Sequence, residues 1–140
     1  MKKALLTISM LLMLGLVFAC SKADENDELI NTSWKLFGFY SHEADSIEIA
    51  QPEDCEYCYV ITFHEDGKIS GRTTSNDFGG EYTISDDHFS IHDCNTTQIV
   101  EMYDGKRFYS SLLQSTRYSL FDRQLKLYYN NQDYLLFNVR

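Results

Sequence analysis

Nine short runs of alternating or aromatic-rich residues, each ended by turn residues, constrain the fold of this chain most strongly. Apolar bulk comes mainly from 10 Tyr and 9 Phe and from β-branched residues, which suit a pleated, half-buried surface. The breaks carry Asp, Asn and Gly, which tight turns accept, and the single proline is Pro52. This spacing predicts a mainly β fold of antiparallel hairpins. The predicted strands are 33–40, 46–50, 57–63, 68–74, 81–85, 88–93, 117–121, 125–129 and 134–139.

One segment departs from the period of two. Between residues 98 and 114 the apolar residues recur at spacings of three and four, and Asp104 and Gly105 interrupt the pattern, so we expect a firm helix over 106–114 only. A lone amphipathic helix must bury its apolar face against another element. We therefore predict a small antiparallel β-barrel whose one helix caps or plugs the end of the sheet.

The first twenty residues predict where the protein is sent. Lys2 and Lys3 precede an apolar run, 4–19, which is short for a membrane-spanning helix and ends on a small residue directly before Cys20. This is the pattern of a secretory signal peptide, residues 1–19, with a lipobox. We expect lipidation at Cys20, and an ordinary signal peptide with a chance cysteine is the alternative.

Residues 21–28 are acidic and nearly free of apolar side chains, so they predict a flexible spacer. We assign residues 20–30 as a lipidated tether ahead of a single domain, 31–140. The acidic run resembles the export signal that sends lipoproteins to the cell surface in some Gram-negative bacteria. A plain solvated spacer is the alternative. We expect an outer-membrane lipoprotein, and surface exposure is left open.

The charge balance excludes several partners. The chain carries 12 Lys and Arg against 21 Asp and Glu, and loss of Lys2 and Lys3 with the signal leaves 10 against 21, a net charge of −11. Nucleic acid requires a basic footprint, which is absent. An anionic lipid surface would repel this charge, so we expect the lipid to be the only contact with the membrane. The oligomeric state is left open.

Residues 31–140 carry short motifs in the order of a known family. They are the runs 31–36, 66–71 and 75–82, the pair Thr96 and Thr97, the run 108–113 and the last two predicted strands. In this order they resemble the META domain, the HslJ-like lipoprotein family, over nearly the whole mature chain. The resemblance implies a small antiparallel barrel of lipocalin-like topology and implies no catalytic residue.

The matching motif positions have a structural interpretation. They are Trp34, Gly71, Asn76, Phe78, Gly80, Tyr82 and Thr97. Gly71, Gly79 and Gly80 permit backbone angles or close approaches that other residues cannot adopt. We expect the Asn76 amide to bond across a turn and Phe78 to fill the floor of the barrel.

The chain also departs from the family pattern. Many members carry a cysteine just before the central asparagine and another after the Thr-Thr pair, placed to bridge two loops. Ser75 and Glu101 stand at those positions here, so both ends of the bridge are missing. This joint loss weakens any loop-binding role borrowed from relatives.

Cys55, Cys58 and Cys94 remain in the mature domain, an odd number for an oxidising compartment. A loop-closing disulfide is favoured, and Cys55 with Cys58, or either with Cys94, are all open pairings. A thioredoxin-like redox pair is disfavoured because no strand-to-helix passage follows Cys58. Zinc would need a fourth ligand such as His64 or His92.

Catalysis has little support in the sequence. His88 and His92 share one face of a predicted strand, but residues four apart in a strand lie about 13 Å apart, too far to ligate one ion. The acidic pairs at 65–66 and 86–87 fall in predicted hairpin turns, where solvated acids are usual. No nucleophile triad or phosphate-binding loop can be assembled. We expect no enzyme activity, no metal and no cofactor.

One short match concerns modification. Asp45, Ser46 and Ile47 resemble the acceptor motif for protein O-glycosylation of some gut-type bacteria, which makes Ser46 the candidate residue. Matches of three residues also arise by chance.

The sequence thus predicts a non-enzymatic, lipid-anchored envelope protein that acts as a binding or stress-protective module. One alternative is an inhibitor of a secreted protease, which would present the loop 51–58 with its proline and two cysteines. A second alternative is a small-molecule carrier whose aromatic residues line a cavity.

Overall fold

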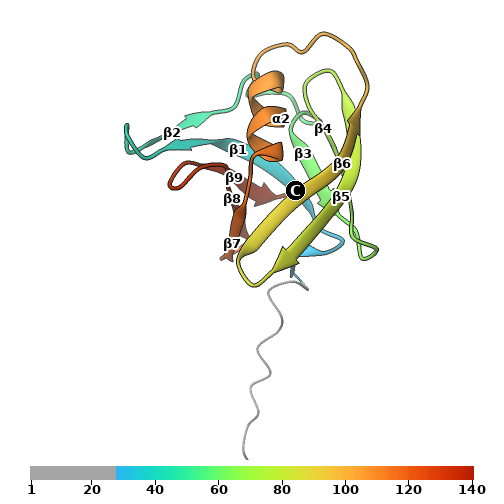
Figure 1. Ribbon diagram of the computed structural model, residues 1–140. Coiled ribbons are helices and arrows are strands. Elements are labelled where there is room, and N and C mark those ends of the chain that lie inside the picture. Colours follow the sequence, from blue (N-terminus) through green and yellow to red (C-terminus); the bar gives the residue numbers. More distant parts are fainter. Residues whose placement is uncertain (1–27) are drawn as a thin grey trace, which may run out of the picture.

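The computed structural model describes residues 28–140 (Figure 1). The predicted signal peptide, Cys20 and most of the predicted tether lie outside the described residues. Nine strands and one complete helix make up the described part. They are β1 (Ser33–Ser41), β2 (Ser46–Ile49), β3 (Val60–Phe63), β4 (Lys68–Arg72), β5 (Asp77–Ser85), β6 (His88–Thr96), α2 (Gly105–Leu113), β7 (Arg117–Phe121), β8 (Gln124–Tyr128) and β9 (Tyr134–Val139).

The strands form one antiparallel sheet that closes on itself. Its order is β2-β1-β3-β4-β5-β6-β7-β8-β9, and β9 pairs again with β1 to complete a ring. β3 and β2 share one edge of β1, where β3 pairs with residues 33–35 and β2 with residues 38–41. The prediction of a mainly β, antiparallel fold with one helix is therefore confirmed.

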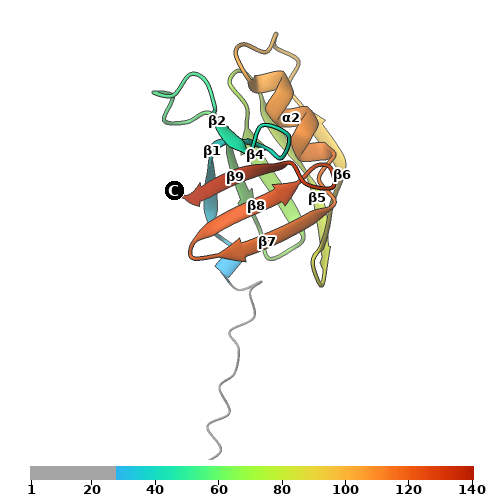
Figure 2. The same cartoon turned by 90° about the vertical axis from the view of Figure 1, so that its left-hand side faces the viewer.

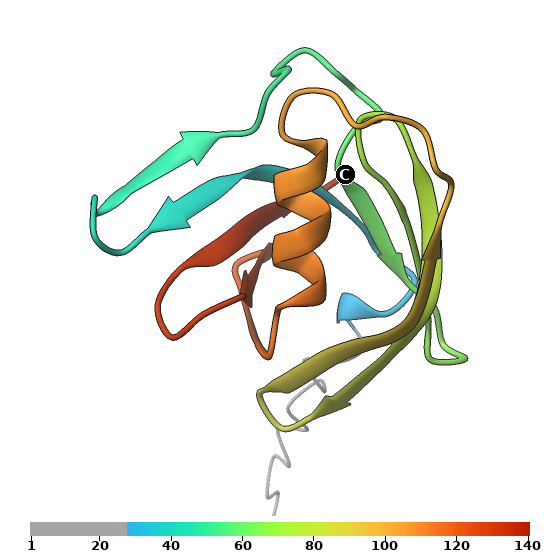
Figure 3. The same cartoon turned by 45° about the horizontal axis from the view of Figure 1, so that its top comes forward.

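The ring is weakest between β6 and β7, where a single residue pair, His88 with Arg117, joins the strands. The helix α2 connects these two strands along the chain and lies across the opening of the ring (Figure 3). Its Phe108 and Leu112 are fully buried. The helix therefore fills the ring at the point where strand pairing is thinnest.

The alternation of residues along β1 determines which of its side chains face the core. Trp34 and Leu36 face the core, and a register shift between Leu36 and Gly38 lets Phe39 face it as well while Phe37 is exposed. Gly38 is required there because a Cβ would collide with the carbonyl oxygen of Glu48 on β2. This bulge interrupts the alternation, and β1 pairs with β3 before it and with β2 after it.

Aromatic side chains occupy the inside of the ring. The largest fully buried ones are Trp34, Phe39, Tyr59, Phe63, Phe108 and Phe137. Phe108 from α2 packs edge-on against Tyr59 and Phe137, with ring centroids 5.3 and 6.2 Å apart. No helix among residues 28–140 is long and apolar enough to cross a membrane.

The predicted domain start is too late. Leu29 is only 1% exposed and accepts a hydrogen bond at its carbonyl from the Trp34 indole at 3.4 Å, and Ile30 forms a bridge with Phe63. Leu29 and Ile30 therefore belong to the folded domain and not to a flexible tether. An apolar pair that directly follows an acidic run was the signal for this boundary.

Candidate functional site

The loop that joins β6 to α2, residues 97–104, exposes four apolar side chains. Ile99, Val100, Met102 and Tyr103 are between 59% and 84% exposed, and we call these four residues the apolar crest. The crest lies at one end of the ring, whereas residues 28–30 lie at the other end (Figures 1 and 2). Exposed apolar residues grouped on one loop are typical of an interaction site.

Asn76 fixes the backbone of the crest. Its side chain, from the turn between β4 and β5, is only 3% exposed. It donates to the Ile99 carbonyl and accepts from the Ile99 N–H, each at 2.8 Å, and it also accepts from the Thr97 hydroxyl at 2.8 Å. The backbone of Ile99 is therefore bonded inward while its side chain points into solvent.

The Glu101 carboxylate is a second anchor of the same loop. One oxygen accepts from the Thr73 hydroxyl and the Asn76 amide, both at 2.5 Å, and the other lies 2.8 Å from the Thr74 hydroxyl. Burial alone would raise the pKa of Glu101, but these hydrogen bonds and one from the Ser75 backbone outweigh it, so the pKa is lowered. Glu101 is held as a carboxylate.

The Glu101 carboxylate connects the two loops that we expected a disulfide to bridge in many META domain proteins. Glu101 stands at one of the two missing cysteine positions, and its partners surround the other, Ser75. Gly105 is needed behind it, because a Cβ there would collide with the Glu101 carboxylate. Hydrogen bonds therefore link these loops here.

A further set of contacts ties the crest to the loop 51–58. The Gln51 N–H donates to the Asp104 carboxylate at 2.8 Å, and the Tyr59 hydroxyl bonds both the Gln51 carbonyl and, at 3.1 Å, the Asp104 N–H. Burial, chiefly, raises the pKa of Tyr59 to about 12. Tyr103 adopts a φ of 51°, a left-handed conformation that costs a non-glycine residue about 1–2 kcal/mol.

The loop 51–58 is closed by a disulfide between Cys55 and Cys58. The Lys35 ammonium donates to the carbonyl oxygens of both cysteines, and burial, followed by the nearby Arg140, lowers the pKa of Lys35. Tyr57, the one aromatic residue of this loop, is 61% exposed and lies beside the Arg140 guanidinium. Among the described cysteines Cys94 is left free and half-buried, with its sulfur 3.4 Å from the Tyr109 hydroxyl.

Most residues of the family motif are buried or make contacts that hold the fold together. Trp34 and Phe78 are buried, Tyr82 packs edge-on against Phe63 and Thr97 bonds Asn76. A Cβ at Gly71 would collide with the ring of Phe78, and one at Gly80 would lie 2.9 Å from the Cα of Cys94. Gly79 is different, because a Cβ there meets nothing closer than 3.7 Å, so the expected steric need for glycine is wrong at this position.

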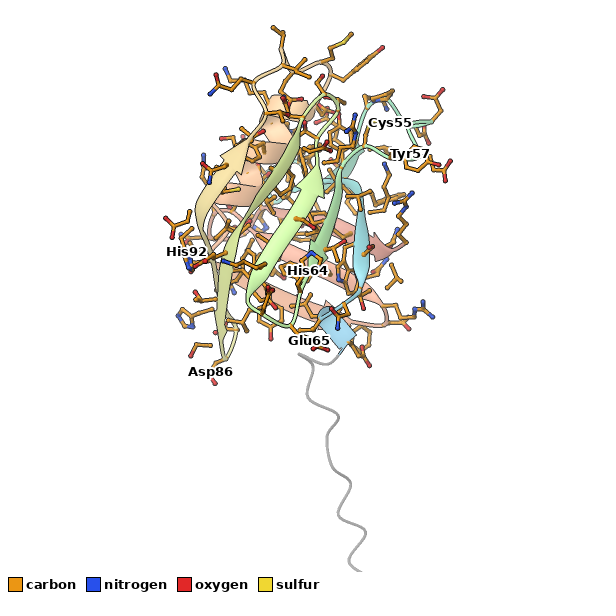
Figure 4. All side chains as sticks on the ribbon, turned by 90° about the vertical axis from the view of Figure 1, so that its right-hand side faces the viewer. Cys55, Tyr57, His64, Glu65, Asp86 and His92 are labelled. Atoms are coloured by element: carbon orange, nitrogen blue, oxygen red, sulfur yellow. A yellow bond between two sulfur atoms is a disulfide. The ribbon has the colours of Figure 1, made fainter. Side chains whose placement is uncertain are left out.

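The remaining predicted groups are scattered over the surface. His64, Glu65 and Asp86 lie toward the end opposite the crest, and Cys55 and Tyr57 lie near the crest (Figure 4). The acids of the two hairpin turns therefore do not combine with the disulfide loop. Ser46, the predicted glycosylation residue, is exposed at the start of β2.

One group of metal-binding residue types occurs among the described residues. The ligand atoms of Glu81, His92 and Asp93 lie within 4.8 Å of one another. The Lys68 ammonium, however, forms an ion pair with Glu81. This positive charge lies against one oxygen of the Glu81 carboxylate and would repel a metal ion bound beside it.

The apolar crest and the role of Glu101 escaped the sequence interpretation. Ile99, Met102 and Tyr103 follow the spacing of three and four that leads up to the predicted helix 106–114, and nothing in that spacing indicated that their side chains would be exposed. Residues 98–104 are not helical, and these side chains are exposed. The break at Asp104 and Gly105 was the available signal, since it separates a run of apolar residues from the helix that would bury them.

Comparison with known proteins identifies the family. The META domain model matches residues 27–140, and the chain therefore belongs to the META domain family. A protein from Burkholderia xenovorans has a similar structure, with a TM-score of 0.67 and 21% identity over 84% of this chain and 88% of that one. A DUF4847 family protein from Bacteroides vulgatus gives a TM-score of 0.61 and 17% identity over 81% of this chain and 95% of that one. These two likenesses concern the fold alone. No curated protein matches the chain.

Proposed function

We propose that this META domain protein is a non-enzymatic, lipid-anchored envelope protein that binds a protein partner through the apolar crest. The observation that carries the proposal is a loop that is bonded inward, by Asn76 on the Ile99 backbone and by the loop's own Glu101 carboxylate, while four apolar side chains are exposed. Apolar area exposed to water is costly, and exposed apolar residues that are grouped together mark interaction sites. A bound partner would remove this area from water.

The position of the crest supports this function. The described chain begins at Glu28 and Leu29, at the end of the ring away from the crest (Figure 2). A lipid on the predicted Cys20 attaches from that same side. The crest would then face away from the anchoring membrane, where proteins of the neighbouring compartment can reach it.

Site-specific photo-cross-linking in living cells tests the proposal. A photoreactive amino acid at Val100 should give a discrete protein adduct. Phe121 is the matched control, because it is also apolar and 83% exposed against 84% for Val100, but it lies outside the crest. Equal adducts at both positions, or none at Val100, would contradict the proposal.

The lipid anchor is tested separately. Labelled palmitate should enter the wild-type protein and not the Cys20→Ser variant. Equal labelling of the two proteins would show that Cys20 is not the lipidated residue. It would not bear on docking through the crest.

A protease inhibitor is the second candidate function, and the loop 51–58 supports it. The Cys55–Cys58 disulfide and the hydrogen bonds from Lys35 fix this loop and leave Tyr57 exposed. A fixed loop loses little entropy on binding a cleft. Tyr57→Ala should then abolish inhibition of a protease secreted by the host without lowering the melting temperature. Failure to slow any such protease removes this candidate.

We do not propose a small-molecule carrier. Large aromatic side chains, among them Trp34, Phe63, Phe108 and Phe137, fill the inside of the ring. The space in which a carrier would hold its ligand is thus taken by the core.

A further inference from the structure

The shape of the crest limits what can cover it. Val100 stands 84% exposed at the crest, and Met102 and Tyr103 follow it, so the loop projects outward. Asn76 and Glu101 hold the loop backbone, and it cannot flatten without breaking these bonds. A projecting and fixed apolar loop fits a concave surface, and Met and Tyr are among the residues enriched in the cores of protein interfaces.

The charges beside the crest limit its partner further. The bonds between Gln51 and Asp104 place the loop 51–58 next to Tyr103, and this loop carries three exposed acids, Glu53, Asp54 and Glu56. The loop has no basic residue.

The nearby cations balance these acids only in part, because Arg140 pairs with Glu56 at 3.9 Å whereas no ion pair among the described residues engages Glu53 or Asp54. Arg107 is paired with Glu48 at 2.8 Å and Arg72 with Asp77 at 2.7 Å. Lys106, in the first turn of α2, is an exposed cation that no ion pair engages. The part of the loop 51–58 that carries Glu53 and Asp54 is therefore negative.

We propose that the partner of the apolar crest is a protein with an apolar cleft bordered by lysine or arginine side chains, which face Glu53 and Asp54. This inference rests on the proposed function. A second copy of this chain would bring the same acids together, and an anionic bilayer would repel them. A basic rim is attracted to them, which speeds association and fixes the orientation of the two surfaces.

Charge reversal in cells that carry the photoreactive residue at Val100 tests the inference. Glu53→Lys with Asp54→Lys should reduce the Val100 adduct by about fivefold, because like charges would then face each other. Glu28→Lys with Glu43→Lys is the matched control. It changes the net charge equally at two exposed residues away from the crest, and it should leave the adduct unchanged. Equal melting temperatures of the purified variants exclude unfolding as the cause.

The outcomes test the basic cleft and docking through the crest separately. An adduct that the 53/54 reversal leaves unchanged, or that the 28/43 reversal reduces as much, overturns the basic cleft but keeps docking through the crest. Absence of any protein adduct at Val100 removes the proposed function itself. Mass spectrometry of the adduct should place the cross-link in an apolar cleft with basic residues at its border. A cross-link to lipid, to a second copy of this chain or to an acidic surface overturns the inference.

Discussion

The side-chain amide of Asn76 binds both backbone polar groups of Ile99, accepting from its N–H and donating to its carbonyl at 2.8 Å each. The pairing resembles one rung of a β-ladder made by a side chain. It joins the turn between β4 and β5 to a loop more than twenty residues later, and it fixes the crest while leaving the Ile99 side chain in solvent.

Asn76→Ala should lower the free energy of unfolding by about 2–4 kcal/mol, because several buried polar groups lose their partner. Hydrogen exchange should then speed up at the backbone amides of residues 99–103. Asn95→Ala is the control, since the exposed Asn95 amide bonds only the nearby Asp93 carbonyl. Unchanged exchange in the Asn76 variant would show that the crest is held by other contacts.

Glu101 should make stability depend on pH. Its pKa is lowered in the folded state, so its contribution is present above the unfolded pKa and is lost as the pH falls through the folded pKa. Glu101→Gln should therefore cost about 1–3 kcal/mol at neutral pH and distinctly less at an acidic pH below the folded pKa, where the native side chain is protonated and resembles glutamine. Urea unfolding at both pH values measures this. A penalty of the same size at both would show that Glu101 does not act as a carboxylate.

Trp34 provides a test of the core. Trp34→Ala should cost about 3–5 kcal/mol in a denaturant melt, because the side chain is 1% exposed. Phe37→Ala is the matched control on the same strand, where the ring is 42% exposed, and it should cost much less. A loss below about 1 kcal/mol for Trp34 would mean that the register of β1 is wrong.

The cysteine pairing can be counted chemically. The Cys20→Ser protein, denatured without reductant, should take up one maleimide, at Cys94, because Cys55 and Cys58 are joined. The added Cys94→Ser change should leave none. Three labels on the first protein would contradict the disulfide.

The sequence predicted those features that local pattern controls. Alternation in β1 placed Trp34 and Leu36 on one face, and the spacing of Tyr109, Leu112 and Leu113 predicted the helix. Of these three, Leu112 is fully buried, whereas Leu113 is 39% exposed. These signals lie within a few neighbouring residues. They were sufficient for the number and order of the strands, the helix and the fold class, but β3 begins at Val60 and not at residue 57, and β5 begins at Asp77 and not at residue 81.

The candidate site could not be predicted in the same way. Glu101 and Asn76 are 25 residues apart, and nothing local to either shows that one will accept a hydrogen bond from the other. The exposure of Met102 depends equally on this distant contact, because the periodic pattern alone would have placed it on the buried face of a helix. The two missing cysteine positions, Ser75 and Glu101, indicated which loops lie together, but they did not show that hydrogen bonds of Glu101 link these loops.

Competition for the partner tests whether the protein docks through the apolar crest. Purified Cys20→Ser protein, added in excess to membranes that carry the photoreactive residue at Val100, should suppress the adduct. The same protein with Val100→Ser and Met102→Ser should fail to compete, and with Phe121→Ser it should compete fully. If the variant lacking the two crest residues competes as well as the parent protein, the crest is not the docking surface.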